Sequence, residues 1–210
     1  MKDYEALSKK HFDGQAAEYD RKDTYYYSRN GKISCRDIAD LLKAVPYGSL
    51  LDVGCRTGFL LELLSAQKAA RYCGLDLSPE MIKMAEKKRI PGAEFMVGSA
   101  ESLPFANEGF DVITCSQSFH HYPHPEKAMS EAWRALKPGG LYILSDTGIG
   151  GLGAWIDNHI LFKLATSGDC HTTNRKGIAK MMEQAGFTVV ASRQIKGTIY
   201  TVTGKKGSER

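Results

Sequence analysis

The segment LLDVGCRTGFL, residues 50–60, carries the strongest structural signal in this chain. An apolar strand here runs through a glycine-containing turn directly into a helix, and the glycines allow a ligand to lie against the backbone. In open α/β sheets ligands bind at the carboxyl ends of the strands, and a helix that begins there directs free N–H groups toward them. The segment therefore predicts a site for a nucleotide-like ligand.

A second strand ends in an acid. Residues 71–75 form an apolar run followed by Asp76, which stands 24 residues after Asp52. A carboxylate at this place can accept hydrogen bonds from the two hydroxyls of a ribose. Gly54 and Gly58 are spaced G-x-x-x-G and so differ from the G-x-G-x-x-G of dinucleotide-binding turns. This spacing disfavours a pyrophosphate cradle and, with it, an NAD-dependent oxidoreductase.

Apolar runs of strand length alternate with segments of helical periodicity. The runs are residues 49–53, 71–75, 93–97, 110–115 and 141–145. This alternation predicts a parallel sheet with crossover helices. Two later strand-like runs, 187–193 and 198–203, predict an antiparallel pair at the edge of the sheet.

Length and composition suit one globular domain over residues 1–210, with 42% hydrophobic and 25% charged residues. A formal net charge of +4, with scattered lysines and arginines, does not indicate a nucleic-acid partner. No apolar run is long enough for stable membrane insertion and the amino-terminal stretch is too polar for a signal peptide, so we expect a cytoplasmic protein. The five cysteines lack metal-ligand spacing and predict reduced, buried thiols.

Ordered motifs in the chain resemble those of class I S-adenosylmethionine-dependent methyltransferases. They are LDVGCRTG (51–58), GLDLSPEM (74–81), GSAESLPF (98–105) and FDVI (110–113), followed by LKPGG (136–140). The resemblance covers roughly residues 12–145 and is greatest to small-molecule enzymes related to the ubiquinone and menaquinone C-methyltransferases. It implies an α/β fold, a Rossmann-like three-layer sandwich whose mostly parallel, seven-stranded sheet carries an antiparallel edge strand.

The resemblance also implies S-adenosylmethionine as cofactor, S-adenosylhomocysteine as product and a small-molecule acceptor. The residues it assigns to the cofactor are Tyr19, Asp52, Gly54, Arg56, Gly58, Asp76, Leu77, Met81, Ser99, Ala100 and Ser116. Asp52 would face the methionine moiety or cap a turn, and Asp76 would bind the ribose or sit at a helix start. Leu77 and Met81 would flank the adenine or serve as core contacts. Tyr19 belongs to the amino-terminal segment, which would close over the cofactor. Alternatively, Tyr19 would be a packing residue that does not touch the cofactor.

Two departures from the family pattern lie in the cofactor site. Arg56 replaces a glycine, so the backbone at this position must have a conformation that a non-glycine residue can adopt. Its guanidinium would pair with the cofactor carboxylate, as a bidentate fork suits, or point outward into solvent. Ser99 replaces the usual aspartate, and because a neutral hydroxyl accepts a weaker hydrogen bond than a carboxylate, weaker cofactor affinity is expected.

Two histidines after the fourth strand are the candidate catalytic residues. The segment SQSFHHYPHP, residues 116–125, lies where substrate approaches the methyl group in related enzymes. His120 and His121 are candidate general bases, since histidine titrates near neutral pH, or they are hydrogen-bonded loop residues. A metal site from His120, His121 and His124 is disfavoured, because adjacent ligands converge poorly and no acid or thiolate stands at ligand spacing. No metal is expected.

The remaining segments have predicted accessory roles. Residues 1–45 would form an amino-terminal helical cap, and residues 148–172 an insert that acts as a substrate lid. Trp155 and Phe162 in the insert would wall an apolar pocket, together with Ile156, Ile160 and Leu161, or the insert would be an amphipathic helix covering the core.

Two other functions stay open. A nucleic-acid or protein methyltransferase would be expected to show a basic face or, for base methylation, an Asn/Asp-Pro-Pro-aromatic run, and residues 116–119 lack that run. A non-catalytic Rossmann module with a degenerate cofactor site is kept open by Arg56 and Ser99.

Overall fold

The computed structural model describes residues 2–21, 26–67 and 70–208. Residues 1 and 22–25 of the predicted cap, and residues 68–69 and 209–210 of the predicted domain, lie outside these ranges.

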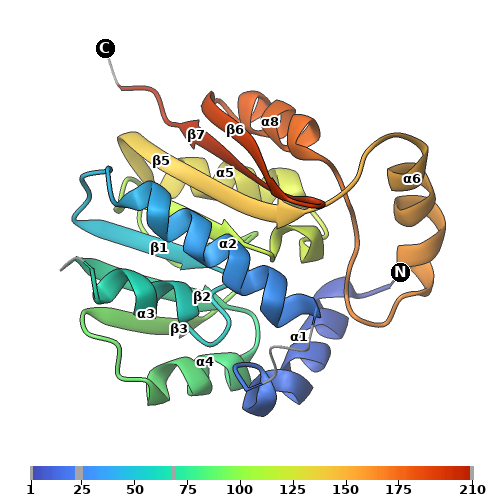
Figure 1. Ribbon diagram of the computed structural model, residues 1–210, viewed down its shortest axis with the longest axis horizontal. Coiled ribbons are helices and arrows are strands. Elements are labelled where there is room, and N and C mark those ends of the chain that lie inside the picture. Colours follow the sequence, from blue (N-terminus) through green and yellow to red (C-terminus); the bar gives the residue numbers. More distant parts are fainter. Residues whose placement is uncertain (1, 22–25, 68–69, 209–210) are drawn as a thin grey trace.

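A mixed sheet forms the centre of the molecule (Figure 1). Its strands are β1 (Ser49–Val53), β2 (Arg71–Asp76), β3 (Ala93–Val97), β4 (Phe110–Ser116), β5 (Leu136–Thr147), β6 (Thr188–Lys196) and β7 (Ile199–Lys205). The seven strands lie in the order β3-β2-β1-β4-β5-β7-β6. β1 to β5 pair in parallel, whereas β7 is antiparallel to both β5 and β6. The predicted fold class is confirmed, with the antiparallel strand inserted next to the edge.

The central strands are apolar because both of their faces are covered. Every residue of β1 is buried, and one core cluster joins Leu51 and Ile113 to the helix that precedes β5, while another joins Leu50 and Val112 to the helix that precedes β1. Alternate residues of one strand thus pack into opposite layers, as the period of a strand requires.

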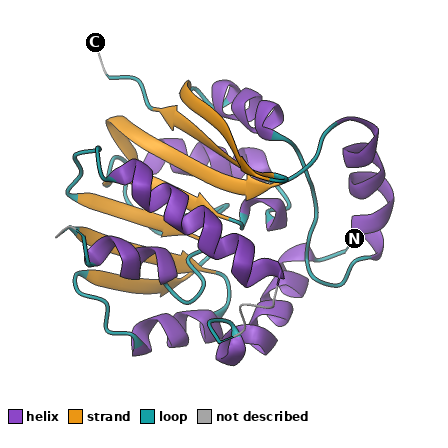
Figure 2. Cartoon of the chain, viewed as in Figure 1, coloured by secondary structure: helices purple, strands orange, loops and turns teal. Residues whose placement is uncertain are grey.

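The helices fill both layers around the sheet (Figure 2). They are α1 (Tyr4–Gln15), η1 (Ala16–Glu18), α2 (Tyr26–Leu42), α3 (Phe59–Ser65), α4 (Pro79–Lys87), η2 (Phe119–His121), α5 (Pro125–Ala135), α6 (Gly151–Ile156), η3 (Asp157–Leu161), α7 (Phe162–Leu164) and α8 (Arg175–Gln184). Residues of α2 and α3 belong to one core cluster, and residues of α5 and α8 belong to the other. The three-layer arrangement is confirmed.

Local sequence signals explain where the helices begin and end. Ser78 caps α4, its Oγ accepting the Met81 N–H, and Pro79 occupies the first position. Lys87, in the last turn, suits the negative end of the helix dipole. α5 ends at Ala135 and β5 begins at Leu136, so the LKPGG motif lies within β5, which starts earlier than the predicted run over 141–145.

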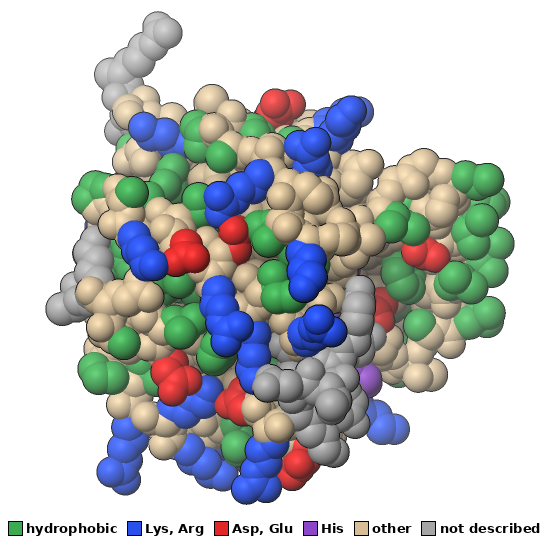
Figure 3. Space-filling model, viewed as in Figure 1, with side chains coloured by type: hydrophobic (Ala, Val, Ile, Leu, Met, Phe, Trp, Pro, Cys, Tyr) green, Lys and Arg blue, Asp and Glu red, His purple; other side chains and the backbone are tan. Residues whose placement is uncertain are grey.

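The insert forms a projecting lobe of α6, η3 and α7. Its large apolar side chains are exposed, with Leu152 at 74% and Trp155 at 53%, and Figure 3 shows hydrophobic side chains gathered on this lobe. No residue of these three elements is buried, so the alternative of a helix that covers the core is wrong.

Two further features concern the described residues alone. None of their helices is both long and apolar enough to cross a membrane. Their five cysteines are free thiols, four buried and Cys170 partly exposed.

Candidate cofactor and acceptor site

A cavity lies at the carboxyl ends of β1 and β4, where the strand order reverses. The chain passes from β1 to β2 on one side and to β4 on the other, which is the usual place for a ligand in open α/β sheets. The cavity has a volume of about 50 Å³. The predicted residues that line it are Gly54, Arg56, Asp76, Leu77, Ser99, Ala100 and His121.

Gly54 makes the turn after β1 fit against the loop after β4. Its φ of +73° lies in the left-handed region, and a Cβ there would meet Ser118 Oγ at 2.0 Å. Only a glycine therefore lets the two loops approach this closely.

Asp76 is held in place by backbone N–H groups at the ends of two strands. Arg56 N–H donates to Oδ2 at 2.7 Å and Ser78 N–H donates to Oδ1 at 2.9 Å. Burial raises the pKa of Asp76 despite these hydrogen bonds and the nearby Arg56 charge, which lower it. Each oxygen keeps a further lone pair that can accept from a ligand hydroxyl.

Arg56 is buried, so the alternative of an outward, solvated arginine is wrong. Its backbone has a φ of +52°, in the left-handed region, and the residue is 9% exposed. Nη1 donates to the Tyr19 hydroxyl at 2.9 Å and Nη2 donates to Ser116 Oγ at 3.2 Å, while Nε is buried without a hydrogen-bond partner. The guanidinium therefore brings an incompletely paired cation to the wall of the cavity.

The first helix closes the cavity. Glu5, Ser8, Lys9 and Phe12 of α1 line it. Ser99 Oγ donates to Glu5 Oε1 at 2.7 Å. The Ser99 hydroxyl, which was expected to contact the cofactor, is therefore hydrogen-bonded to a carboxylate of α1.

The other predicted cofactor residues do not line this cavity. Asp52 is buried and accepts from Thr114 Oγ1 at 2.8 Å, and burial raises its pKa to about 7. Gly58 caps α3 in a left-handed conformation, and Met81 is buried. Tyr19 and Ser116 reach the cavity only through their hydrogen bonds to Arg56.

A second cavity of about 310 Å³ lies beside the first. It is lined by Gln117, His120, Thr147, Gly148, Ile149, Asp157, Phe162, Asp169, His171, Thr172 and Thr198. Of the five insert residues predicted to wall a pocket, Phe162 lines this cavity, whereas the other four do not line it and are exposed. Gln117 lines both cavities, and its amide nitrogen donates to Ser34 Oγ at 3.0 Å.

His120 is fixed by an acid at the end of β5. Its Nδ1 lies 2.6 Å from Asp146 Oδ1, and its backbone N–H donates to Asp146 Oδ2 at 3.1 Å. Burial alone would lower the pKa of His120, but the charges of Asp146 and Asp169 and the hydrogen bond that the ring donates to Asp146 raise it. With Nδ1 engaged, Nε2 faces Asp169 Oδ1 at 3.5 Å.

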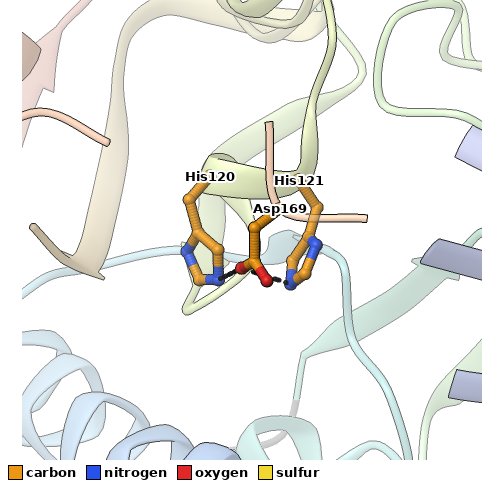
Figure 4. Close-up of side chains that lie close together, drawn as sticks. All are labelled: His120, His121 and Asp169. Atoms are coloured by element: carbon orange, nitrogen blue, oxygen red, sulfur yellow. Dashed lines mark ion pairs between the residues drawn. The ribbon is translucent and has the colours of Figure 1, made fainter. Parts of the chain in front are cut away.

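His121 shares the same carboxylate (Figure 4). Its Nε2 lies 3.8 Å from Asp169 Oδ1, and neither ring nitrogen makes a hydrogen bond of ordinary geometry to a described residue. Burial, and then the neighbouring His120, lower the pKa of His121 to about 3. Burial opposes ionisation of Asp169, yet the two histidines and Ser167 lower the pKa of this acid.

Sequence reasoning missed Asp146, Asp169 and Gln117. Asp146 follows an apolar strand and could have been noticed by analogy with Asp76, since both end parallel strands. Asp169 carries no such signal, because it lies 48 residues after His121 within the insert. Its place is set by backbone contacts, in which the N–H groups of Cys170 and His171 donate to the His120 carbonyl.

The first cavity fits the adenosine end of S-adenosylmethionine in chemistry, although not in volume. Asp76 offers acceptors for ribose hydroxyls, and Leu77 and Ala100 offer apolar contacts for a base. The orphaned Nε of Arg56 offers a donor for a carboxylate. Ligand sites of this kind occupy about 300 Å³ or more, so we expect α1, whose residues line the cavity, to shift when the cofactor enters.

Comparison with known proteins places these residues in a family context. Residues 51–144 match the family model described as a methyltransferase domain. The chain is 42% identical over 99 residues to the phthiotriol/phenolphthiotriol dimycocerosates methyltransferase of Mycobacterium leprae (strain TN), an alignment that spans 46% of this chain and 37% of that relative. It is 33% identical over 135 residues to the demethylmenaquinone methyltransferase of Renibacterium salmoninarum, spanning 64% of this chain and 56% of that relative. The chain thus spans little more than half, or less, of these relatives' lengths.

The fold has a close structural counterpart. A chain in the complex between the Haloferax volcanii Trm112 methyltransferase activator and a methyltransferase matches with a TM-score of 0.80 at 18% identity, covering 97% of this chain and 99% of that chain. At this identity the likeness concerns the fold. The resemblance first inferred from the motifs is confirmed.

Proposed function

With its resemblance to class I S-adenosylmethionine-dependent methyltransferases confirmed by family and fold, we propose that this chain transfers a methyl group from S-adenosylmethionine to a small-molecule acceptor. The observation that carries the proposal is the convergence of Gly54, Asp76, Leu77 and Ala100 on one cavity at the topological switch point. The cofactor supplies a methyl group on a sulfonium sulfur, which keeps the bonding electrons of the broken C–S bond as the acceptor atom takes the methyl.

In this proposal the residues of the chain bind the cofactor and orient it. Asp76 would accept from the ribose, Leu77 and Ala100 would hold the base, and Arg56 would neutralise the carboxylate of the methionine end. Much of the rate can come from such positioning, because the leaving group is already activated.

The acceptor would enter through the second cavity. Gln117 lies between the two cavities, and Phe162 and Ile149 give the second one an apolar wall. Two relatives carry names that refer to lipid-like acceptors, a dimycocerosate and a menaquinone precursor. An apolar acceptor is therefore the class that we propose.

Of the two candidate bases, His120 is better placed. Asp146 holds Nδ1, so Nε2 points toward the second cavity as the acceptor for a proton from the substrate. His121 lines the cofactor cavity and has no orienting acid at its second nitrogen.

Titration calorimetry tests the cofactor assignment. We expect S-adenosylmethionine and S-adenosylhomocysteine to bind, NADH not to bind, and Asp76→Asn to weaken binding at least about tenfold through loss of charged hydrogen bonds. Asp111→Asn is the matched control, since Asp111 lies at the opposite end of β4. Failure of both sulfur compounds to bind would contradict the proposal and favour a non-catalytic module.

A further inference from the structure

The pair of histidines and the acid between them make up one cluster on the wall that separates the two cavities. His120 and Asp169 line the second cavity, and His121 lines the first. The two rings come from η2, and Asp169 comes from the end of the insert, so that all three side chains converge (Figure 4).

The separations within this cluster suit a metal ion. The three ligand atoms lie within 4.8 Å of one another, and the Asp169 Oδ1 distances are 3.5 Å to His120 Nε2 and 3.8 Å to His121 Nε2. Two ligand atoms that are each about 2.1 Å from a tetrahedral ion lie about 3.4 Å apart. Small side-chain rotations would therefore complete the site.

The surroundings orient each ligand as metal sites require. Asp146 holds Nδ1 of His120, which leaves Nε2 for the ion, as in carboxylate–histidine–metal arrangements. Ser167 Oγ donates to Oδ2 of Asp169, which leaves Oδ1 directed at the histidines.

His121 supplies the independent observation. Its side chain is 5% exposed, and its Nε2 lies 3.8 Å from the Asp169 carboxylate with no hydrogen bond of ordinary geometry among the described residues. A buried polar atom left in this way is rare in folded proteins. Asp169 lies 3.5 Å from His120 Nε2, also beyond ordinary hydrogen-bond length, whereas an ion at the centre of the cluster would bind all three side chains.

We propose that His120, His121 and Asp169 bind one divalent transition-metal ion. Two imidazoles and one carboxylate suit zinc and similar borderline ions, while magnesium and calcium prefer oxygen ligands alone. Three protein ligands leave a coordination position open toward the second cavity. If the proposed methyl transfer holds, an oxygen or nitrogen of the acceptor would occupy this position, and Nε2 of His120 would then act as a ligand and no longer as a proton acceptor.

Calorimetric titration of the full, chelator-treated chain with Zn²⁺ tests the site. We expect one ion per chain, and at least about tenfold weaker binding in Asp169→Asn and in Asp146→Asn, the latter because outer partners of ligand histidines contribute that much. His124→Gln is the matched control, because its ring belongs to the same loop but is exposed. Equal affinity in wild type and Asp169→Asn, or loss of binding in His124→Gln, would overturn the proposal.

A second measurement needs no substitution in the cluster. In protein with isotope-labelled histidine rings, Zn²⁺ should shift the NMR signals of His120 and His121. The signals of the exposed His124 and His159 should not change. The variants His124→Gln and His159→Gln identify these two signals. Shifts confined to the exposed histidines would overturn the site even if Asp169→Asn did not fold. S-adenosylhomocysteine titrated into the same samples separates the two proposals: binding of this compound without Zn²⁺ rejects only the metal site, and the reverse rejects only the cofactor assignment.

Discussion

The Arg56 guanidinium donates to the Tyr19 hydroxyl across 2.9 Å, joining the turn after β1 to the segment that follows α1. The two residues are 37 positions apart in the chain. Arg56 also donates to Ser116 at the end of β4. A single side chain, at a position where the motif usually has glycine, thus links three parts of the candidate site.

We expect Arg56→Ala to weaken the affinity for S-adenosylhomocysteine about tenfold or more, because a charged hydrogen bond to the ligand carboxylate would be lost. Titration calorimetry measures the change. Arg89→Ala is the matched control, since Arg89 also has a positive φ but an exposed side chain. Unchanged or tighter binding in Arg56→Ala would show that the guanidinium does not pair with the cofactor.

Opening of α1 should limit the entry of the cofactor. Glu5→Ala removes the acceptor of the Ser99 hydroxyl, and a hydrogen bond of about 1 kcal/mol corresponds to an association rate constant about fivefold higher. Stopped-flow mixing with S-adenosylhomocysteine measures this constant. Glu18→Ala, at an exposed carboxylate that pairs with exposed Arg21, should leave the rate unchanged. A lower rate in Glu5→Ala would indicate that Glu5 contacts the ligand instead.

Gly168 holds the insert against α1. Its φ is +87°, and a Cβ there would lie 2.5 Å from the Ser8 backbone nitrogen. We expect Gly168→Ala to cost about 3 kcal/mol of local stability, from left-handed strain and overpacking together. Hydrogen exchange of the Cys170 and His171 amides, which donate to the His120 carbonyl, should become faster.

Gly197→Ala separates strain from overpacking. Gly197 has a φ of +56° with no atom within 4 Å of its would-be Cβ, so its substitution should cost only about 1 kcal/mol of strain. Equal effects of the two substitutions would mean that the contact with Ser8 is not rigid.

Asp111 should make stability depend on pH in the acid range. Burial opposes its ionisation, but hydrogen bonds from Gly48, Ser49 and Lys137 lower its pKa to about 2. Because the folded pKa lies below the unfolded value, the stabilisation is complete above about pH 4 and is lost as the pH falls toward 2.

Asp111→Asn should therefore lower the free energy of unfolding by about 1 kcal/mol at pH 7, after allowance for solvent screening of this partly exposed pair. Urea unfolding across the pH range measures the difference, which should shrink toward zero near pH 2. A constant difference would mean that the pKa of Asp111 is not lowered.

The succession of strands along the chain could be predicted because their signals are local, and the apolar run over 49–53 agrees with β1. The start of β5 was missed, because this strand begins at Leu136 and not at residue 141. The burial of the Arg56 side chain could not be predicted, because its hydrogen-bond partners Tyr19, Cys35 and Ser116 are distant in the chain and come near it only on folding. The alternative of a core-covering helix in the insert failed for another reason. The apolar pattern of the insert is that of a buried helix, yet Trp155 is 53% exposed in the fold.

Within the site, the residues adjacent to the glycine turn and to Asp76 were found from sequence, since strand ends meet at one edge of a sheet. The partners of His120 were not. The side chains of Asp146 and Asp169 contact the His120 ring across 26 and 49 residues of sequence, for which no spacing rule exists.

The arrangement of the two cavities has a kinetic consequence. Among the described residues, Gln117 lines both cavities, but the insert that bounds the second cavity also packs against α1, where Gly168 meets Ser8. A movement of α1 that widens the first cavity would therefore also disturb the second, so we expect ligand exchange at the two cavities to be coupled.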